Sequence, residues 1–215
     1  MHEYKRSGPF QAAIPIVLAS ASPRRRSLLF GLGIDVVVAP SQGREPEPRV
    51  GESPERYARR TAWEKVHDVS RLYPDSLVIG ADTVVVFDGQ IIGKPRDAYD
   101  ARETLRRLAG RRHEVVTVCC ILPPDGLGPA EDFSVTTGVW IAPVDEAVIG
   151  SYVDGGEPMD KAGSYAIQGA GAFLVERIEG SYTNVVGLPL CELVSVLKRV
   201  GAITPRSHEG GLGDA

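Results

Sequence analysis

The sequence lacks the long apolar stretches that mark membrane and secreted proteins. No run of about eighteen apolar residues is present, so we expect no transmembrane helix and no membrane partner. Residues 1–13 also lack the apolar core of a signal peptide. These absences predict a cytoplasmic protein, and its 215 residues are enough to build a sizeable hydrophobic core.

Positive charge is scarce as well. The formal net charge is -4, whereas a general nucleic-acid-binding protein normally carries a basic excess, so we expect no stable nucleic-acid partner. A single local basic site remains compatible with this charge. The basic residues are 19 arginines and only five lysines, so Lys65, Lys94 and Lys161 stand out in their apolar or glycine-rich surroundings.

The three cysteines form no metal-binding pattern. Neither a Cys-x-x-Cys pair nor a histidine at zinc-finger spacing occurs. Cys119 and Cys120 lie inside a strand-like apolar run, so we expect them to be small buried side chains. Cys191 is distant from both in the sequence, and three unpaired cysteines fit a reducing compartment.

Strand and helix signals alternate along the chain. Short apolar or β-branched runs predict strands at 14–19, 34–39, 77–87, 90–93, 113–122, 133–142 and 172–178, and we expect the run at 34–39 to be buried. Capped amphipathic stretches predict helices at 22–32, 53–73, 97–108, 145–153 and 188–200. This order predicts an α/β (mixed α+β) fold with a mixed twisted sheet and flanking helices. We expect a single domain over residues 14–202, with flexible ends at 1–13 and 203–215.

The helix predicted to begin at Ser22 has an unusual charge pattern. Ser22 is a good N-cap and Pro23 suits the first helical position. Three arginines, Arg24 to Arg26, then lie where the helix dipole disfavours cations, and a bound phosphate would relieve that conflict. The alternative is a capped helix with solvated arginines.

Asp82 lies in the middle of the apolar run at 77–87. A buried carboxylate needs a cation, a metal or strong donors near it. It is therefore a candidate general base or Mg²⁺ ligand. A structural ion pair, or a bulge marked by Gly80, would also explain it.

Two lysines are candidates to lie near this carboxylate. Lys65 shares an otherwise apolar helix face, so it either reaches solvent at the edge or points inward toward an anion. A hairpin turning at 88–89 places Lys94 opposite Thr83 and close to Asp82. A carboxylate and lysines together suit a site for a metal and a phosphate.

Residues 155–171 hold five glycines. The stretch matches neither a P-loop nor a dinucleotide fingerprint, but its glycines favour positive φ values or close backbone approach to a ligand. Lys161 and Gln168 would then face that ligand. A flexible structural loop is the alternative.

Taken together, these pieces resemble the Maf family of nucleoside triphosphate pyrophosphatases over residues 14–202. The matching segments are Ser20-Ala21-Ser22-Pro23-Arg24-Arg25, the loop acid Glu45, the helical Lys65, Gly80-Ala81-Asp82-Thr83, Gly93-Lys94-Pro95, Asp160-Lys161-Ala162-Gly163-Ser164-Tyr165, Ile167-Gln168-Gly169, and Glu179-Gly180-Ser181-Tyr182 through Gly187-Leu188-Pro189-Leu190. Their number and order make the resemblance specific, although each segment alone is weak.

The resemblance implies hydrolysis of a nucleoside triphosphate to the monophosphate and pyrophosphate with a divalent cation, Mg²⁺ or Mn²⁺. It also implies an ITPase-like mixed sheet with two lobes around a central cleft, a cytoplasmic location and a homodimer. The Gln168 segment and the Gly-Ser-Tyr segment resemble the branch that acts on dTTP and UTP, including modified pyrimidine nucleotides. The branch that acts on a methylated GTP, and a nucleotide-binding regulator of cell division with little turnover, are the alternatives.

The resemblance also implies roles for individual residues. Asp82 would accept a proton and, with Glu45, hold the metal, while Lys65 and Lys94 would neutralise charge on the phosphates. Phosphate and substrate binding would involve Ser20, Ser22, Arg25 and Lys161, with Arg24, Thr83 and Gln168 at specificity positions.

Overall fold

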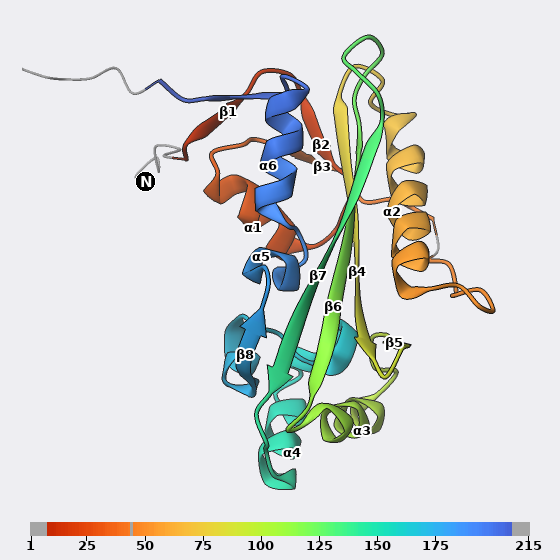
Figure 1. Ribbon diagram of the computed structural model, residues 1–215, viewed down its shortest axis with the longest axis vertical. Helices are drawn as coiled ribbons and strands as arrows, with labels where there is room; N and C mark the ends of the chain where they lie inside the picture. Colours follow the sequence, from red (N-terminus) through yellow and green to blue (C-terminus); the bar gives the residue numbers. More distant parts are fainter. Residues whose placement is uncertain (1–7, 44, 208–215) are drawn as a thin grey trace, which may run out of the picture.

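The computed structural model describes residues 8–43 and 45–207. A long twisted sheet forms the centre of the molecule (Figure 1). Its strands are β2 (Ile16–Leu18), β3 (Val37–Val38), β4 (Leu77–Phe87), β5 (Gln90–Ile92), β6 (Arg112–Leu122), β7 (Glu131–Ile141) and β8 (Val175–Glu179). The spatial order is β3-β2-β4-β6-β7-β8, with β5 paired to part of β4. Pairing with β2 is parallel for both β3 and β4, and the other pairs are antiparallel, so the mixed sheet predicted from the sequence is confirmed.

Helices cover both faces of this sheet (Figure 1). They are α1 (Pro23–Gly31), α2 (Pro54–Ser70), α3 (Ala98–Leu108), α4 (Glu146–Asp154), α5 (Tyr182–Val186) and α6 (Leu190–Arg199). Three 3₁₀ helices, η1 (Glu157–Asp160), η2 (Ala162–Ser164) and η3 (Gly169–Leu174), make up most of the glycine-rich stretch. Among the described residues, no helix is long and apolar enough to span a bilayer.

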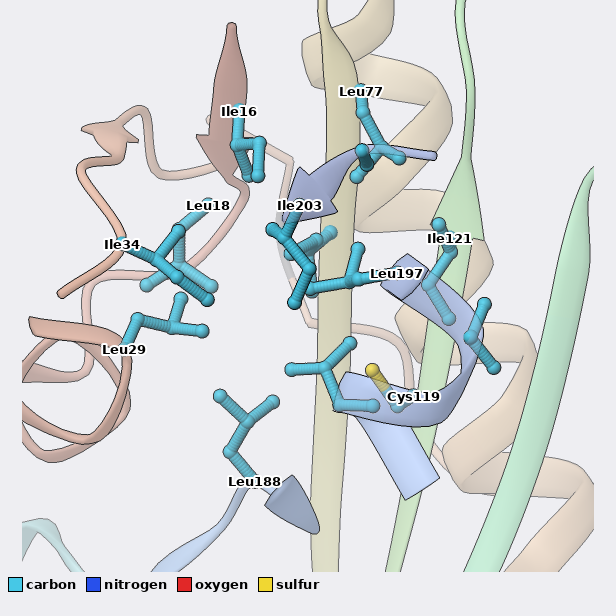
Figure 2. Close-up of a cluster of buried hydrophobic side chains, with 14 of the residues drawn as sticks. Ile16, Leu18, Leu29, Ile34, Leu77, Cys119, Ile121, Leu188, Leu197 and Ile203 are labelled. Atoms are coloured by element: carbon cyan, nitrogen blue, oxygen red, sulfur yellow. The ribbon is translucent and has the colours of Figure 1, made fainter. Parts of the chain in front are cut away.

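Alternation along β4 sends its side chains into different cores. Ile79 and Ala81 join the cluster under α1 and α6, which Figure 2 shows around Leu18, Leu29 and Leu197. The next side chains, at even-numbered positions such as Val78 and Val84, pack against α2. The two adjacent cysteines are likewise divided between these clusters and are fully buried, as the sequence predicts.

The run at 34–39 is not the buried strand that we expect from its composition. Only Val37 and Val38 form a strand, and their exposed fractions are 49% and 38%. β3 is the outermost strand of the sheet, so among the described strands it has a neighbour on one side only. β-branched residues indicate an extended backbone, whereas burial depends on the position of the strand in the sheet.

Parts of the two expected flexible ends are ordered. β1 (Phe10–Ala12) pairs with β9 (Ile203–Pro205) in a separate two-stranded sheet, in which Phe10 packs on the α1–α6 cluster and Ile203 is buried. These runs are too short to give a period, and their pairing spans almost the whole chain. The remainder of both predicted ends, 1–7 and 208–215, lies outside the described residues. The sequence also gives no signal for the five-residue α5, and 172–174 belong to η3 rather than to a strand.

Candidate active site

An interruption in the pairing of β4 locates the site. On one edge, β4 pairs with β6 from Val78 to Val86. On the other edge, β2 covers 77–79 and β5 covers 85–87, so no described strand covers 80–84. This uncovered edge borders a cavity of about 650 Å³. Its lining includes every site residue predicted from the sequence: Ser20, Ser22, Arg24, Arg25, Glu45, Lys65, Asp82, Thr83, Lys94, Lys161 and Gln168.

Asp82 is held by the helix that packs on its face of the sheet. Lys65 Nζ donates to Asp82 Oδ1 across 2.6 Å, and the Asp82 residue is only 4% exposed. Among the described residues, Oδ2 has no hydrogen-bond partner. Burial raises the pKa of this carboxyl, although Lys65 opposes the shift. A buried, unpartnered oxygen on a residue that lines a cavity is suited to receive a proton or a cation.

Gly80 explains how Lys65 on α2 can reach Asp82 on β4. The β4–β6 register is continuous past Gly80, so the bulge considered from the sequence is absent. A Cβ at this glycine would instead collide with Val66 and with the carbonyl of Ala62, both in α2. The missing side chain therefore lets α2 approach β4 closely enough for the ion pair to form.

Arg25 substitutes for a neighbouring strand at the uncovered edge. Its guanidinium donates to the Ala81 carbonyl at 2.8 Å, to Ser20 Oγ at 3.0 Å, to Thr83 Oγ1 at 2.9 Å and to the Gly187 carbonyl at 2.7 Å. Burial lowers the pKa of this group, and the charge of Asp82 opposes that shift. A guanidinium has five N–H bonds, so one is left for a phosphate. Arg25 is thus chiefly a brace for the edge, a role that the motif alone does not reveal.

The helix that carries Arg25 begins as the sequence predicts. Ser22 caps α1 by accepting from the Arg25 backbone N–H, and Pro23 occupies the first turn. Arg24 is half-buried and lines the cavity, whereas Arg26 is exposed outside it. The start of α1 therefore presents backbone N–H groups and one arginine to the cavity.

Glu45 and Lys94 face each other across the cavity mouth. Their charged atoms are 3.8 Å apart and both side chains are exposed. The β4–β5 hairpin has the expected register, with Val85 opposite Ile92, but the ion pair of Lys94 is with Glu45 rather than Asp82. Glu45 is nevertheless close enough to Asp82 to raise the pKa of that carboxyl further.

These two carboxylates are the candidate metal ligands. Within the described residues, no cluster of three or more histidine, cysteine or acidic side chains is arranged to hold a metal. Mg²⁺ commonly takes one or two carboxylates from a protein and completes its shell with water and substrate phosphate oxygens. The unpartnered Oδ2 of Asp82 and the exposed Glu45 fit that donor set.

The glycine-rich stretch is ordered by a carboxylate that the sequence analysis missed. Glu157 accepts from the backbone N–H groups of Ala170 and Gly171 at 3.0 and 2.7 Å, and from the Tyr152 hydroxyl at 2.9 Å. A Cβ at Gly169 would collide with this carboxylate, and one at Gly171 with the tyrosine hydroxyl. The glycines therefore allow close packing around Glu157. The position of Glu157, directly after Gly155 and Gly156, was the sequence signal that could have identified it.

Gln168 and Lys161 differ in how free they are to meet a ligand. Across the described part of the chain, the Gln168 amide makes no hydrogen bond, and it is half-buried in the cavity wall. Lys161 instead donates to the Glu157 carbonyl and to Asp160, both at 2.6 Å. Gln168 is therefore the freer polar group on this side of the cavity.

Comparisons with known proteins show which family the chain is similar to. A family model described as Maf-like protein matches residues 15–200. The dTTP/UTP pyrophosphatase of Oleidesulfovibrio alaskensis is 50% identical over 198 residues, covering 92% of this chain and 90% of that protein. The dTTP/UTP pyrophosphatase of Anaeromyxobacter dehalogenans is 48% identical over 193 residues, covering 88% and 96%. Among solved structures, the Staphylococcus aureus Ham1 protein is similar with a TM-score of 0.43 and 18% identity, covering 60% of this chain and 72% of that one.

Proposed function

The chain belongs to the Maf family, and on this premise we propose that it hydrolyses dTTP and UTP, including modified pyrimidine forms, to the monophosphate and pyrophosphate. The names of its relatives at about half identity support this substrate class. The observation that carries the chemistry is the buried Asp82, which has one unpartnered carboxylate oxygen and lines the same cavity as lysines, arginines and a free glutamine amide.

Glu45 and Asp82 would hold the divalent cation, Mg²⁺ or Mn²⁺, together with triphosphate oxygens. When bound, such a cation neutralises phosphate charge and polarises the phosphorus–oxygen bonds. The start of α1, with Ser20, Ser22 and Arg24, would bind phosphate oxygens through N–H and O–H groups. Lys65 and Lys94 would offset the negative charge that grows on the leaving pyrophosphate.

Asp82 would accept the proton of the attacking water. Its raised pKa makes the carboxylate a better base than an exposed aspartate, while Lys65 keeps it ionised and fixes its orientation. Attack breaks the bond between the α-phosphate and the pyrophosphate. The water oxygen forms the new bond to the α-phosphorus and stays in the nucleoside monophosphate, pyrophosphate is the leaving group, and the proton remains on Asp82 until solvent takes it.

Gln168 would read the base. One of its amide donors matches the O4 of uracil and thymine. We also propose, from the family resemblance, that the protein is a cytoplasmic homodimer. Cell fractionation and analytical ultracentrifugation test those two points.

A panel of nucleoside triphosphates tests the proposed activity. Purified protein is incubated with each triphosphate and Mg²⁺ or Mn²⁺, and the products are identified by chromatography. We expect dTTP and UTP to give the highest kcat/KM. Preference for a methylated GTP would move the chain to the other branch, and binding without turnover would make it a regulator.

A further inference from the structure

A chain of side-chain hydrogen bonds runs behind the cavity, from α1 through two strands to α5. Arg25 donates to Thr83 Oγ1 at 2.9 Å, and Thr83 Oγ1 lies 2.9 Å from Thr117 Oγ1. Thr117 Oγ1 in turn lies 3.1 Å from the carbonyl oxygen of Asn184. Thr83 and Thr117 are directly opposite each other in the β4–β6 ladder, and Thr117 is fully buried.

The two ends of this chain fix the direction of every hydrogen in it. An arginine only donates and a carbonyl only accepts, while each hydroxyl has one hydrogen to give. Thr117 therefore gives its hydrogen to Asn184, and Thr83 gives its own to Thr117. The reverse direction would leave the Thr117 oxygen facing the Asn184 carbonyl with no hydrogen between them.

The consequence concerns the side of Thr83 that faces the cavity. Thr83 is only partly buried and lines the cavity wall, as Gln168 does. Its hydrogen is directed at Thr117 and one lone pair accepts from Arg25, so one acceptor lone pair has no partner among the described residues. Thr83 can thus accept a hydrogen bond from a nucleotide but cannot donate one.

We infer that Thr117 is a positioning residue that fixes the Thr83 hydroxyl as an acceptor, and that this acceptor takes the N3–H of uracil or thymine. The inference rests on the proposed function. The Thr83 acceptor also provides a fixed polarity that Gln168 lacks, because a free amide can turn over and match cytosine as well as uracil. Cytosine has an acceptor at N3, so it would place two acceptors face to face at Thr83 and be rejected.

Substitution of Thr117 tests this polarity. Thr117→Val removes the hydroxyl and keeps the side-chain shape, so the Thr83 hydroxyl loses its acceptor and is free to donate into the cavity. We expect the ratio of kcat/KM for UTP over CTP to fall about tenfold, mainly through a higher KM for UTP and a lower KM for CTP. Thr117→Ser keeps the hydroxyl, and its ratio should stay within about twofold of the wild-type ratio.

Thr137→Val is the matched control. Thr137 is also a buried threonine, and its hydroxyl accepts a hydrogen bond from the side-chain amide of Asn184, but it has no hydrogen bond to Thr83. Loss of its hydroxyl should lower the melting temperature without changing the UTP/CTP ratio. A ratio that moves equally in the Thr137 and Thr117 valine variants, or stays unchanged in Thr117→Val, overturns the inference.

A substrate analogue removes the dependence on a folded variant. In N3-methyluridine triphosphate a methyl group replaces the N3 hydrogen and O4 stays an acceptor, so wild-type kcat/KM should fall at least about tenfold relative to UTP. Equal turnover of UTP and the analogue overturns the inference and leaves the proposed function intact. Failure of the wild-type protein to release pyrophosphate from UTP and dTTP overturns the proposed function itself, and with it this inference.

Discussion

Lys65, in the middle of α2, donates to the buried carboxylate of Asp82, in the middle of β4. The pair joins the helix layer to the sheet at the point where β4 has one uncovered edge. The ion pair engages only one of the two carboxylate oxygens, and the other has no hydrogen-bond partner among the described residues. This relationship links the stability of the fold to its proposed chemistry.

Asp82→Asn should abolish most turnover. An amide cannot accept the proton of the attacking water, so kcat for pyrophosphate release should fall by about 10²–10⁴-fold. Steady-state assays with UTP measure this, and circular dichroism checks the fold. Asp132→Asn, which alters an ion pair with Arg59 away from the cavity lining, is the control and should retain its turnover. Full activity in Asp82→Asn would exclude the proton-acceptor role.

Lys65→Met should destabilise the protein. The change leaves Asp82 buried without its cation, which should reduce the free energy of unfolding by about 2 kcal/mol because Lys65 is itself partly exposed. Urea denaturation measures this difference. The double variant with Asp82→Asn should regain part of the loss, since no unpaired charge then remains. Equal stability in the single and double variants would contradict this account of the pair.

Glu157→Gln should loosen the segment that carries Gln168. The new amide can accept only one of the two backbone hydrogen bonds that Glu157 receives from Ala170 and Gly171. We expect KM for UTP to rise several-fold, which corresponds to about 1 kcal/mol of lost binding free energy, with a smaller effect on kcat. Glu176→Gln changes an exposed acid on β8 and should leave KM unchanged. An unaltered KM in Glu157→Gln would show that this carboxylate does not position the substrate-facing segment.

His113 should make stability depend on pH. Burial lowers its pKa from 6.5 to about 4, with Arg112 adding to the shift, and its Nε2 lies 2.7 Å from the Tyr165 hydroxyl. Between these values the unfolded chain binds a proton that the folded protein does not. Stability from this group is therefore complete above pH 6.5 and is lost as the pH falls toward 4.

The size of this effect is measured by urea denaturation at several pH values. Between pH 7 and pH 4.5, His113 should contribute a loss of about 2 kcal/mol in the free energy of unfolding. His113→Gln keeps a polar partner for Tyr165 and has no titrating ring, so its pH dependence should be flatter by that amount. Parallel curves for the two proteins would mean that His113 is not held neutral.

Much of the fold follows from local signals in the sequence. Ser22 and Pro23 mark the start of α1, and the long apolar run gives the bounds of β4 without error. Those signals depend on capping and periodicity, which involve neighbouring residues only. The β1–β9 pair and the exposed β3 could not be predicted, because they depend on contacts between distant segments and on position in the sheet.

The candidate site shows the same division. The sequence brings Asp82, Lys65 and Gln168 to attention through their residue types and surroundings, and Glu45 only through the family resemblance. The structure places all four around one cavity. The hydrogen bonds of Arg25 and Thr117 to distant segments are long-range, so no local pattern reveals that these two residues brace the site. The ion pair of Lys94 with Glu45 could not be predicted for the same reason, because hairpin register gives neighbours along β4, whereas Glu45 comes from a separate loop.

The most direct test of the central claim is the stoichiometry of products formed from UTP by the wild-type protein with Mg²⁺. Phosphorus NMR distinguishes pyrophosphate from inorganic phosphate in one sample, and Asp82→Asn serves as the inactive reference. The account predicts equal amounts of UMP and pyrophosphate, with neither formed by the variant above background. Release of inorganic phosphate with UDP, or equal rates for the two proteins, would contradict it.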